Sequence, residues 1–173
     1  MSLYHLVGAE LEWTRPHILT PEYELCHSSD VIGSLTFRSA FGSFATATVD
    51  LGCWTFKRTG FVKTHVTVKP CDSEREIGVF HNNTWTGGGT LELPGGRAIQ
   101  ANTNFWHSKY EFTKDGETLV TYRTRQRLTL TGQMAILPPA QDMPELPWLM
   151  MLGWYLAVMM HRDDSAACVV VPS

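Results

Sequence analysis

Apolar and polar residues alternate in short runs from about residue 10 to residue 137 of this chain. A period of two is typical of β-strands that bury one face, and turn residues interrupt the runs about every 8–12 positions. The run at 61–69 shows two faces, one formed by Val62, Val66 and Val68 and the other by Lys63, His65 and Lys69. The region is therefore predicted to be antiparallel β structure, with one strand face toward a core and the other toward water.

The runs predict roughly twelve strands in all. The runs from which these strands are expected lie at residues 10–14, 23–27, 31–38, 43–49, 53–58, 61–69, 76–81, 90–93, 97–101, 105–112, 118–125, 127–131 and 133–137. The segments Pro94-Gly95-Gly96 and Lys114-Asp115-Gly116 supply residues suited to the positive φ angles of tight hairpin turns. Because no amphipathic helical pattern separates the strands, we expect consecutive strands to pair as a meander rather than as a parallel sheet.

The pattern changes after Pro138-Pro139, where the fifteen residues LPWLMMLGWYLAVMM at 146–160 carry no charged side chain. Prolines at 144 and 147 suit the first turn of a helix, which is predicted over about residues 145–161 with a short tail at 162–173. Fifteen helical residues span about 22 Å, less than the hydrocarbon thickness of about 30 Å that a spanning helix must cross. No transmembrane span is therefore expected, and a C-terminal membrane anchor is the less favoured alternative.

A helix that is apolar on every face must be buried on every face, and a closed antiparallel barrel is wide enough to hold one. We therefore predict one domain over residues 1–173. It is mainly β, a closed antiparallel barrel of roughly 12 strands wrapped around one hydrophobic C-terminal helix. Gly153 and Ala157 would form a thin stripe where the wall comes close, and the methionines of the helix would fill irregular gaps. These are Met150, Met151, Met159 and Met160.

This combination of a β meander and one hydrophobic C-terminal helix resembles the tubby C-terminal-like superfamily, which includes LURP-one-related proteins and phospholipid scramblases. The resemblance covers about residues 8–161 and also rests on the aromatic stretches GCWTFKR at 52–58 and NFW at 104–106. It implies contact with membrane phospholipids: phosphoinositide headgroups for tubby proteins and lipid movement for scramblases. The acid-rich calcium segment of scramblases is represented here only by Asp142 and Glu145, so no metal is expected.

Composition narrows the range of partners and compartments to be expected. The net charge of −3 gives no global attraction to nucleic acid or to anionic membranes, so nucleic acid is not expected as a partner and membrane contact requires a local basic patch. The four cysteines, Cys26, Cys53, Cys71 and Cys168, are scattered, and the first residues show no signal-peptide pattern. We therefore expect free thiols in a protein that is cytoplasmic, with or without peripheral attachment to a membrane.

The densest basic feature is the segment YRTRQR at 122–127. In a strand, Arg123, Arg125 and Arg127 share one face, an arrangement suited to phosphate or anionic lipid headgroups. The opposite, apolar face would be Val120, Tyr122 and Leu128. The alternative interpretation is a solvated outer face whose arginines pair with carboxylates on neighbouring strands.

Three more basic residues, Lys57, Arg58 and Lys63, would extend this patch if their strands are neighbours of the arginine strand. The seven histidines lack the spacing of metal ligands, and His65 and His107 are expected on exposed strand faces. The glycine-rich segment 86–90 precedes a strand instead of a helix and is predicted to be a turn, not a phosphate-binding loop.

No nucleophile elbow and no matched pair of carboxylates occurs, so no catalytic residue and no cofactor are expected. The sequence favours a non-enzymatic barrel that binds anionic phospholipid headgroups peripherally. Two alternatives stay open: a protein-interaction scaffold without lipid binding, and a membrane-anchored, scramblase-like protein.

Overall fold

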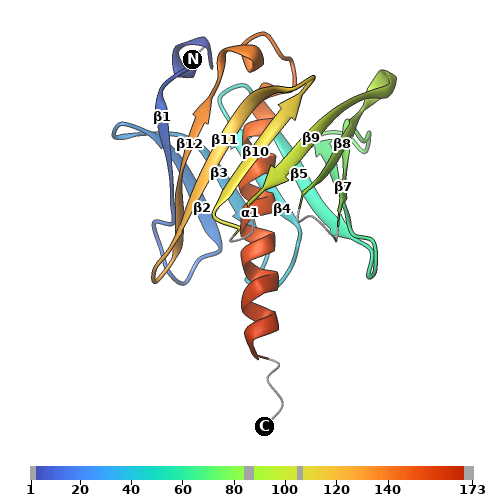
Figure 1. The fold of residues 1–173 in the computed structure, drawn as a ribbon. Helices are drawn as coiled ribbons and strands as arrows, with labels where there is room; N and C mark the ends of the chain where they lie inside the picture. The colour runs from blue at the N-terminus through green and yellow to red at the C-terminus, as the bar shows by residue number, and fades with distance from the viewer. Residues whose placement is uncertain (1–2, 84–87, 105–106, 170–173) are drawn as a thin grey trace.

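The chain folds into a closed β-barrel with a helix through its lumen (Figure 1). The structure, a computed structural model, describes residues 3–83, 88–104 and 107–169. Twelve antiparallel strands in these residues follow one another around the wall in chain order, and β1 closes the barrel against β12. The strands are β1 (Glu10–Thr14), β2 (Glu22–His27), β3 (Asp30–Phe37), β4 (Ala45–Val49), β5 (Gly52–Thr59), β6 (His65–Pro70), β7 (Gly78–Asn82), β8 (Gly89–Leu93), β9 (Arg97–Thr103), β10 (Lys109–Lys114), β11 (Glu117–Gln126) and β12 (Leu130–Ile136).

The strands form because alternate side chains can be buried in the lumen. In β12, every second residue from Leu130 to Ile136 is buried, which is the period-two pattern predicted from the sequence. The hairpins also follow the prediction, since Gly95 and Gly96 have φ of 81° and 77°, and Gly116 has φ of 81°. The predicted meander is therefore confirmed, and consecutive strands pair throughout the described wall.

The lumen is filled by α1 (Leu146–Val169). The short helix η3 (Pro138–Ala140) lies between β12 and α1 in the chain. Between Leu146 and Met159, every side chain except those of Pro147 and Leu156 is buried. Trp154 stacks on Trp13 of the wall with ring centroids 5.2 Å apart. The predicted barrel around a hydrophobic helix is confirmed. In the described residues, none of the helices combines the length and the apolar character needed to cross a bilayer.

At Gly153 the wall comes close to the helix, as its place in the apolar run predicted. A methyl group at this position would overlap the ring of Tyr122 from β11. The Tyr122 hydroxyl is buried and donates a hydrogen bond to the carbonyl oxygen of Met150, 2.9 Å away. Burial therefore raises the pKa of Tyr122 well above its usual value. The missing side chain thus leaves room for the Tyr122 ring beside the helix.

The meander gives the barrel two different ends. At the helix-entry end, α1 begins, and the loops are 28–29, 50–51, 71–77, 94–96, 115–116 and 137–145. At the helix-exit end, α1 emerges, and the loops are 15–21, 38–44, 60–64, 83–88, 104–108 and 127–129. Figure 1 shows the last turns of α1 projecting below the wall at this second end.

Several predicted boundaries were wrong. β6 begins at His65, so Phe61 to Thr64 form a loop and Val62 is exposed instead of facing the core. The two strands predicted at 127–131 and 133–137 are one strand, β12, preceded by a turn at 127–129. α1 continues to Val169, so most of the predicted tail at 162–173 is helical. The predicted starts of the strand at 105–112 and of the turn at 86–90 lie outside the described residues.

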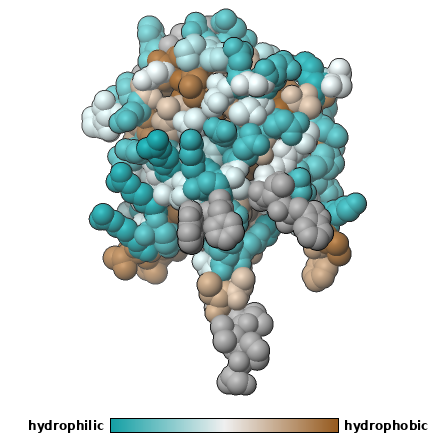
Figure 2. Space-filling model, viewed as in Figure 1, coloured by the Kyte–Doolittle hydropathy of each residue, from teal (hydrophilic) through white to brown (hydrophobic). Residues whose placement is uncertain are grey.

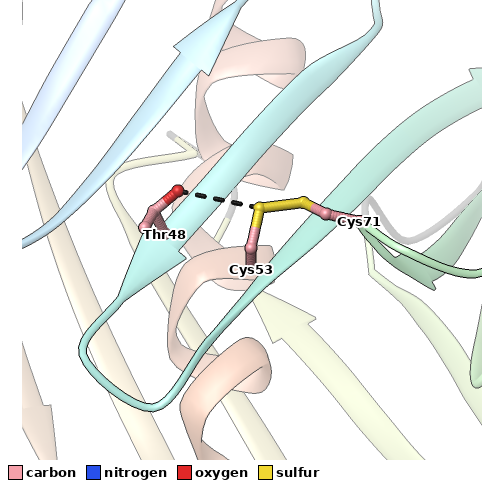
Figure 3. Close-up of a disulfide and its surroundings, with 3 residues drawn as sticks. All are labelled: Thr48, Cys53 and Cys71. Carbon is pink, nitrogen blue, oxygen red and sulfur yellow. Dashed lines mark hydrogen bonds between the residues drawn. A yellow bond between two sulfur atoms is a disulfide. The ribbon is translucent and has the colours of Figure 1, made fainter.

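The expectation of four free thiols was also wrong. Cys53, in β5, forms a disulfide with Cys71, which directly follows β6, with Cα atoms 5.4 Å apart (Figure 3). The two residues are far apart in sequence but adjacent in space, because β5 and β6 are paired strands. Cys26 and Cys168 are free. Spacing alone gave no sign of this pairing, which depends on the strand register.

Candidate functional site

The three arginines singled out in the sequence are exposed near the helix-exit end. Arg123 and Arg125 point outward from the last part of β11, whereas Arg127 lies just beyond the strand in the turn before β12. Lys109 of β10 is the cross-strand partner of Arg123 and adds a fourth cation. Among the described residues, no salt bridge involves any of these four side chains, so the alternative of arginines neutralised by neighbouring carboxylates is not what the structure shows. These four residues are called the basic cluster.

The other face of the arginine strand is partly as predicted. Val120 and Tyr122 are buried in the lumen. Leu128, expected beside them, is 90% exposed because the strand ends at Gln126 and the chain turns before β12 begins.

The expected extension of the patch by Lys57, Arg58 and Lys63 was wrong. β5 lies six strands from β11 in either direction around the barrel, so these residues are on the opposite wall. Lys57 is exposed on β5, and Lys63 is in the loop that follows. Arg58 points inward, where its guanidinium donates two hydrogen bonds to Asp163 of α1 at 2.6 and 2.9 Å. The hydrogen bond to Asp163 raises the pKa of Arg58, whose role is therefore to hold the emerging helix.

Three further contacts fasten α1 to the helix-exit loops. Arg162 donates to the carbonyl oxygen of Gly42 at 2.8 Å, and the Tyr155 hydroxyl donates to that of Ser43 at 2.6 Å. His107 Nδ1 lies 3.0 Å from an Asp164 carboxylate oxygen. His107 was expected on an exposed strand face, but it precedes β10 with φ of 52° and contacts the helix. The helix and the loops therefore form one connected end of the barrel.

Charge is divided between the two ends of the molecule. The described residues of the helix-exit loops contain four basic residues and no acidic one, which gives a net charge of +4. These are Arg15, Arg38, Lys63 and Arg127. The helix-entry loops contain seven acidic residues and one basic residue, Arg75, a net charge of −6. The acidic residues are Asp50, Asp72, Glu74, Glu76, Asp115, Asp142 and Glu145. The loops at the two ends are thus oppositely charged, and the basic cluster lies beside the basic loops. At the helix-exit end α1 adds Arg162, Asp163 and Asp164, which lowers the net charge there to +3, and at the helix-entry end Glu145 is buried against Arg97.

Two small cavities lie beside α1 between Gly153 and Asp164. One, of about 40 Å³, lies between Gly153, Met159 and residues of the wall strands β5 to β7 and β9 to β11. The other, of about 140 Å³, is lined by His107, Tyr110, His161 and Asp164. Burial lowers the pKa of His161 while Asp164 opposes that shift, and burial raises the pKa of Tyr110. The first cavity has room for only a few water molecules, whereas the second is larger, so α1 fills most but not all of the lumen.

Among the described residues, no group of three His, Cys, Asp or Glu side chains is placed to hold a metal ion. Thr59 Oγ1 lies 2.8 Å from His65 Nε2, but the two are cross-strand partners on the outer wall and line neither cavity. Asp142 is exposed, and Glu145 is buried beside Arg97, its salt-bridge partner. They do not form a cation site together.

Neither the role of Lys109 nor the division of charge between the ends was predicted from the sequence. Lys109 shares the polar face of its strand with Glu111, and this alternation is visible in the sequence. Its pairing with Arg123 is not, because it depends on the register between β10 and β11. The basic loops are dispersed between residues 15 and 127, and only barrel closure brings them to one end. No protein-family model, curated protein or solved structure matches this chain.

Proposed function

We propose that this protein is a non-enzymatic, tubby-like barrel that binds anionic phospholipid headgroups peripherally through the basic cluster of Lys109, Arg123, Arg125 and Arg127. The observation that carries the proposal is that these four exposed cations have no salt-bridge partner among the described residues. The barrel around one hydrophobic helix is the architecture that the resemblance to tubby-like proteins implies, which supports the assignment to that group.

Electrostatics sets the expected strength of this binding. Each basic residue close to an anionic bilayer contributes about 1 kcal/mol, so four contribute about 4 kcal/mol, which corresponds to millimolar affinity. The acidic helix-entry end is repelled by the same surface, so the field orients the molecule with its basic end toward the lipid. Binding of this kind is reversible and falls as salt screens the charges.

The test is sedimentation of the purified protein with phosphatidylcholine vesicles that contain phosphatidylserine, at about 50 mM salt, where screening is weak. We expect the wild type to sediment and Arg123→Glu/Arg125→Glu to remain in solution with an unchanged thermal transition, since both side chains point into solvent. The matched control is Arg75→Glu/Lys114→Glu, which makes the same change of charge toward the helix-entry end. We expect this control to sediment like the wild type.

A wild-type protein that stays in solution with these vesicles would remove the lipid proposal and leave the protein-interaction scaffold in its place. Equal loss of binding in both double variants would mean that total charge, and not the basic cluster, controls attachment. Sedimentation that persists in the arginine variant would assign binding to another surface of the barrel.

A further inference from the structure

Four loops at the helix-exit end share a composition that the basic cluster does not explain. Each has one cation and at least one large apolar side chain exposed to solvent. The apolar residues are Ile18 and Leu19 in loop 15–21, Phe41 in loop 38–44, Phe61 and Val62 in loop 60–64, and Leu128 in loop 127–129. Phe41 and Phe61 are fully exposed, with no packing partner that would account for an aromatic residue.

These four loops are consecutive around the rim. β12 neighbours β1, β2 neighbours β3, and β4 neighbours β5, so the loops form one continuous arc. Six of the eight large hydrophobic side chains exposed among the described residues lie in this arc. Figure 2 shows hydrophobic residues hanging from the lower rim of the barrel on both sides of the emerging helix, below a largely hydrophilic wall. The apolar side chains are therefore collected at one end.

The arrangement fits a bilayer surface because cations and apolar tips occur together in each of the loops that surround the emerging helix. An amphipathic surface that enters the headgroup region buries apolar side chains and leaves its cations among the anionic phosphates. Among the described residues, none of the four loop cations has a salt-bridge partner. Arg38 lies over the Phe44 ring with 4.0 Å to the centroid, and Arg15 lies over the Tyr23 ring and donates one hydrogen bond to the carbonyl oxygen of Thr20. A cation that is free or resting on an aromatic ring remains able to meet a phosphate.

We propose that these four loops form a membrane-insertion rim, in which Phe41, Phe61 and Leu19 enter the headgroup region of an anionic bilayer while Arg15, Arg38, Lys63 and Arg127 bind phosphates around them. The inference rests on the proposed binding of anionic lipid and adds an apolar, salt-resistant component to it. The lipid contact then extends over most of the helix-exit end, with the basic cluster on one flank.

The test uses Phe41→Ser/Phe61→Ser, which removes both aromatic tips without a change in charge. The matched control is Val31→Ser/Leu51→Ser, which removes two exposed apolar side chains near the helix-entry end. Binding to phosphatidylcholine vesicles that contain phosphatidylserine is measured by sedimentation, and insertion by the surface-pressure rise of a monolayer of the same lipids. We expect the aromatic variant to bind about tenfold to a hundredfold more weakly and to cause little pressure rise.

The control variant is expected to match the wild type in both measurements. If the aromatic variant also matches the wild type while both bind, the insertion rim is wrong and the headgroup proposal stands. If the wild type does not bind at all, both proposals fail together. If the wild type forms oligomers without vesicles, and the aromatic variant is monomeric yet binds vesicles equally well, the rim contacts a second copy of the chain and the inference is overturned.

Discussion

Gly153 is the residue at which local helix preference and packing in the barrel oppose each other. Alanine is favoured over glycine in a helix by about 1 kcal/mol. At this position, however, a methyl group would overlap the Tyr122 ring, whose hydroxyl is fixed by its bond to Met150. We therefore expect Gly153→Ala to lower the free energy of unfolding by about 2 kcal/mol, measured by urea denaturation, because overpacking outweighs helix preference.

A second background separates overlap from other effects. In a Tyr122→Leu protein the ring is absent, so the added methyl group has room, and Gly153→Ala should cost much less than in the wild type. An equal cost in both backgrounds would show that the two residues do not interact in the folded protein. Stabilisation by Gly153→Ala in the wild type would contradict the position of α1 in the lumen.

At the scale of elements, the disulfide joins β5 to the segment after β6 and leads to a prediction about the oxidation state of the cysteines. Disulfides are rare in a reducing cytoplasm, where thioredoxin and glutathione keep thiols reduced. We expect protein unfolded without a reductant to show two reactive thiols, from Cys26 and Cys168, and four after reduction. Alkylation followed by mass measurement gives both numbers.

The variant Cys53→Ser/Cys71→Ser should unfold at lower denaturant concentration than the oxidised wild type, because the unfolded chain loses a covalent constraint worth about 3 kcal/mol for a loop of this size. Cys26→Ser/Cys168→Ser changes two cysteines outside the bond and is the matched control. Four reactive thiols in protein extracted with alkylating agent present would mean that the bond does not form where the protein is made.

Most elements could be predicted because their patterns are local. A strand such as β12 shows its alternation within seven residues, and α1 shows its burial as an unbroken apolar run. The errors lie where a local pattern continues past the end of an element. Phe61 and Val62 extend the alternation of β6, yet they belong to a loop with two exposed apolar side chains. Exposed apolar residues in a turn cannot be distinguished from core residues in the sequence. The residues on which the proposed membrane contact depends were therefore interpreted as part of a buried strand.

At the scale of the whole molecule, the candidate site could be predicted only in part. Arg123, Arg125 and Arg127 are adjacent in sequence, so their cluster was visible without a structure. The loops of the rim come from segments between residues 15 and 129, and no property of one segment indicates that the others lie beside it. Closure of β1 against β12 decides which loops share an end. The polarity of the molecule is therefore a consequence of topology, not of composition.

This polarity leads to a prediction about orientation. α1 ends beyond the helix-exit loops, whereas the first described residues lie at the opposite end (Figure 1). If the helix-exit end faces the bilayer, a globular protein fused directly after residue 173 would hold the basic loops away from the lipid. Charges held farther away than the Debye length, about 10 Å at 0.1 M salt, contribute little attraction.

We expect the C-terminal fusion to bind anionic vesicles about tenfold more weakly than the unfused chain, because both the apolar and the electrostatic contacts require close approach. The same globular protein fused before residue 1 is the matched control and should leave binding within about twofold of the unfused chain. Both fusions must unfold at the same temperature as the unfused barrel for the comparison to apply. Equal binding by the two fusions would place the lipid contact on the side wall, where the basic cluster acts without the rim. Stronger interference from the N-terminal fusion would reverse the proposed orientation.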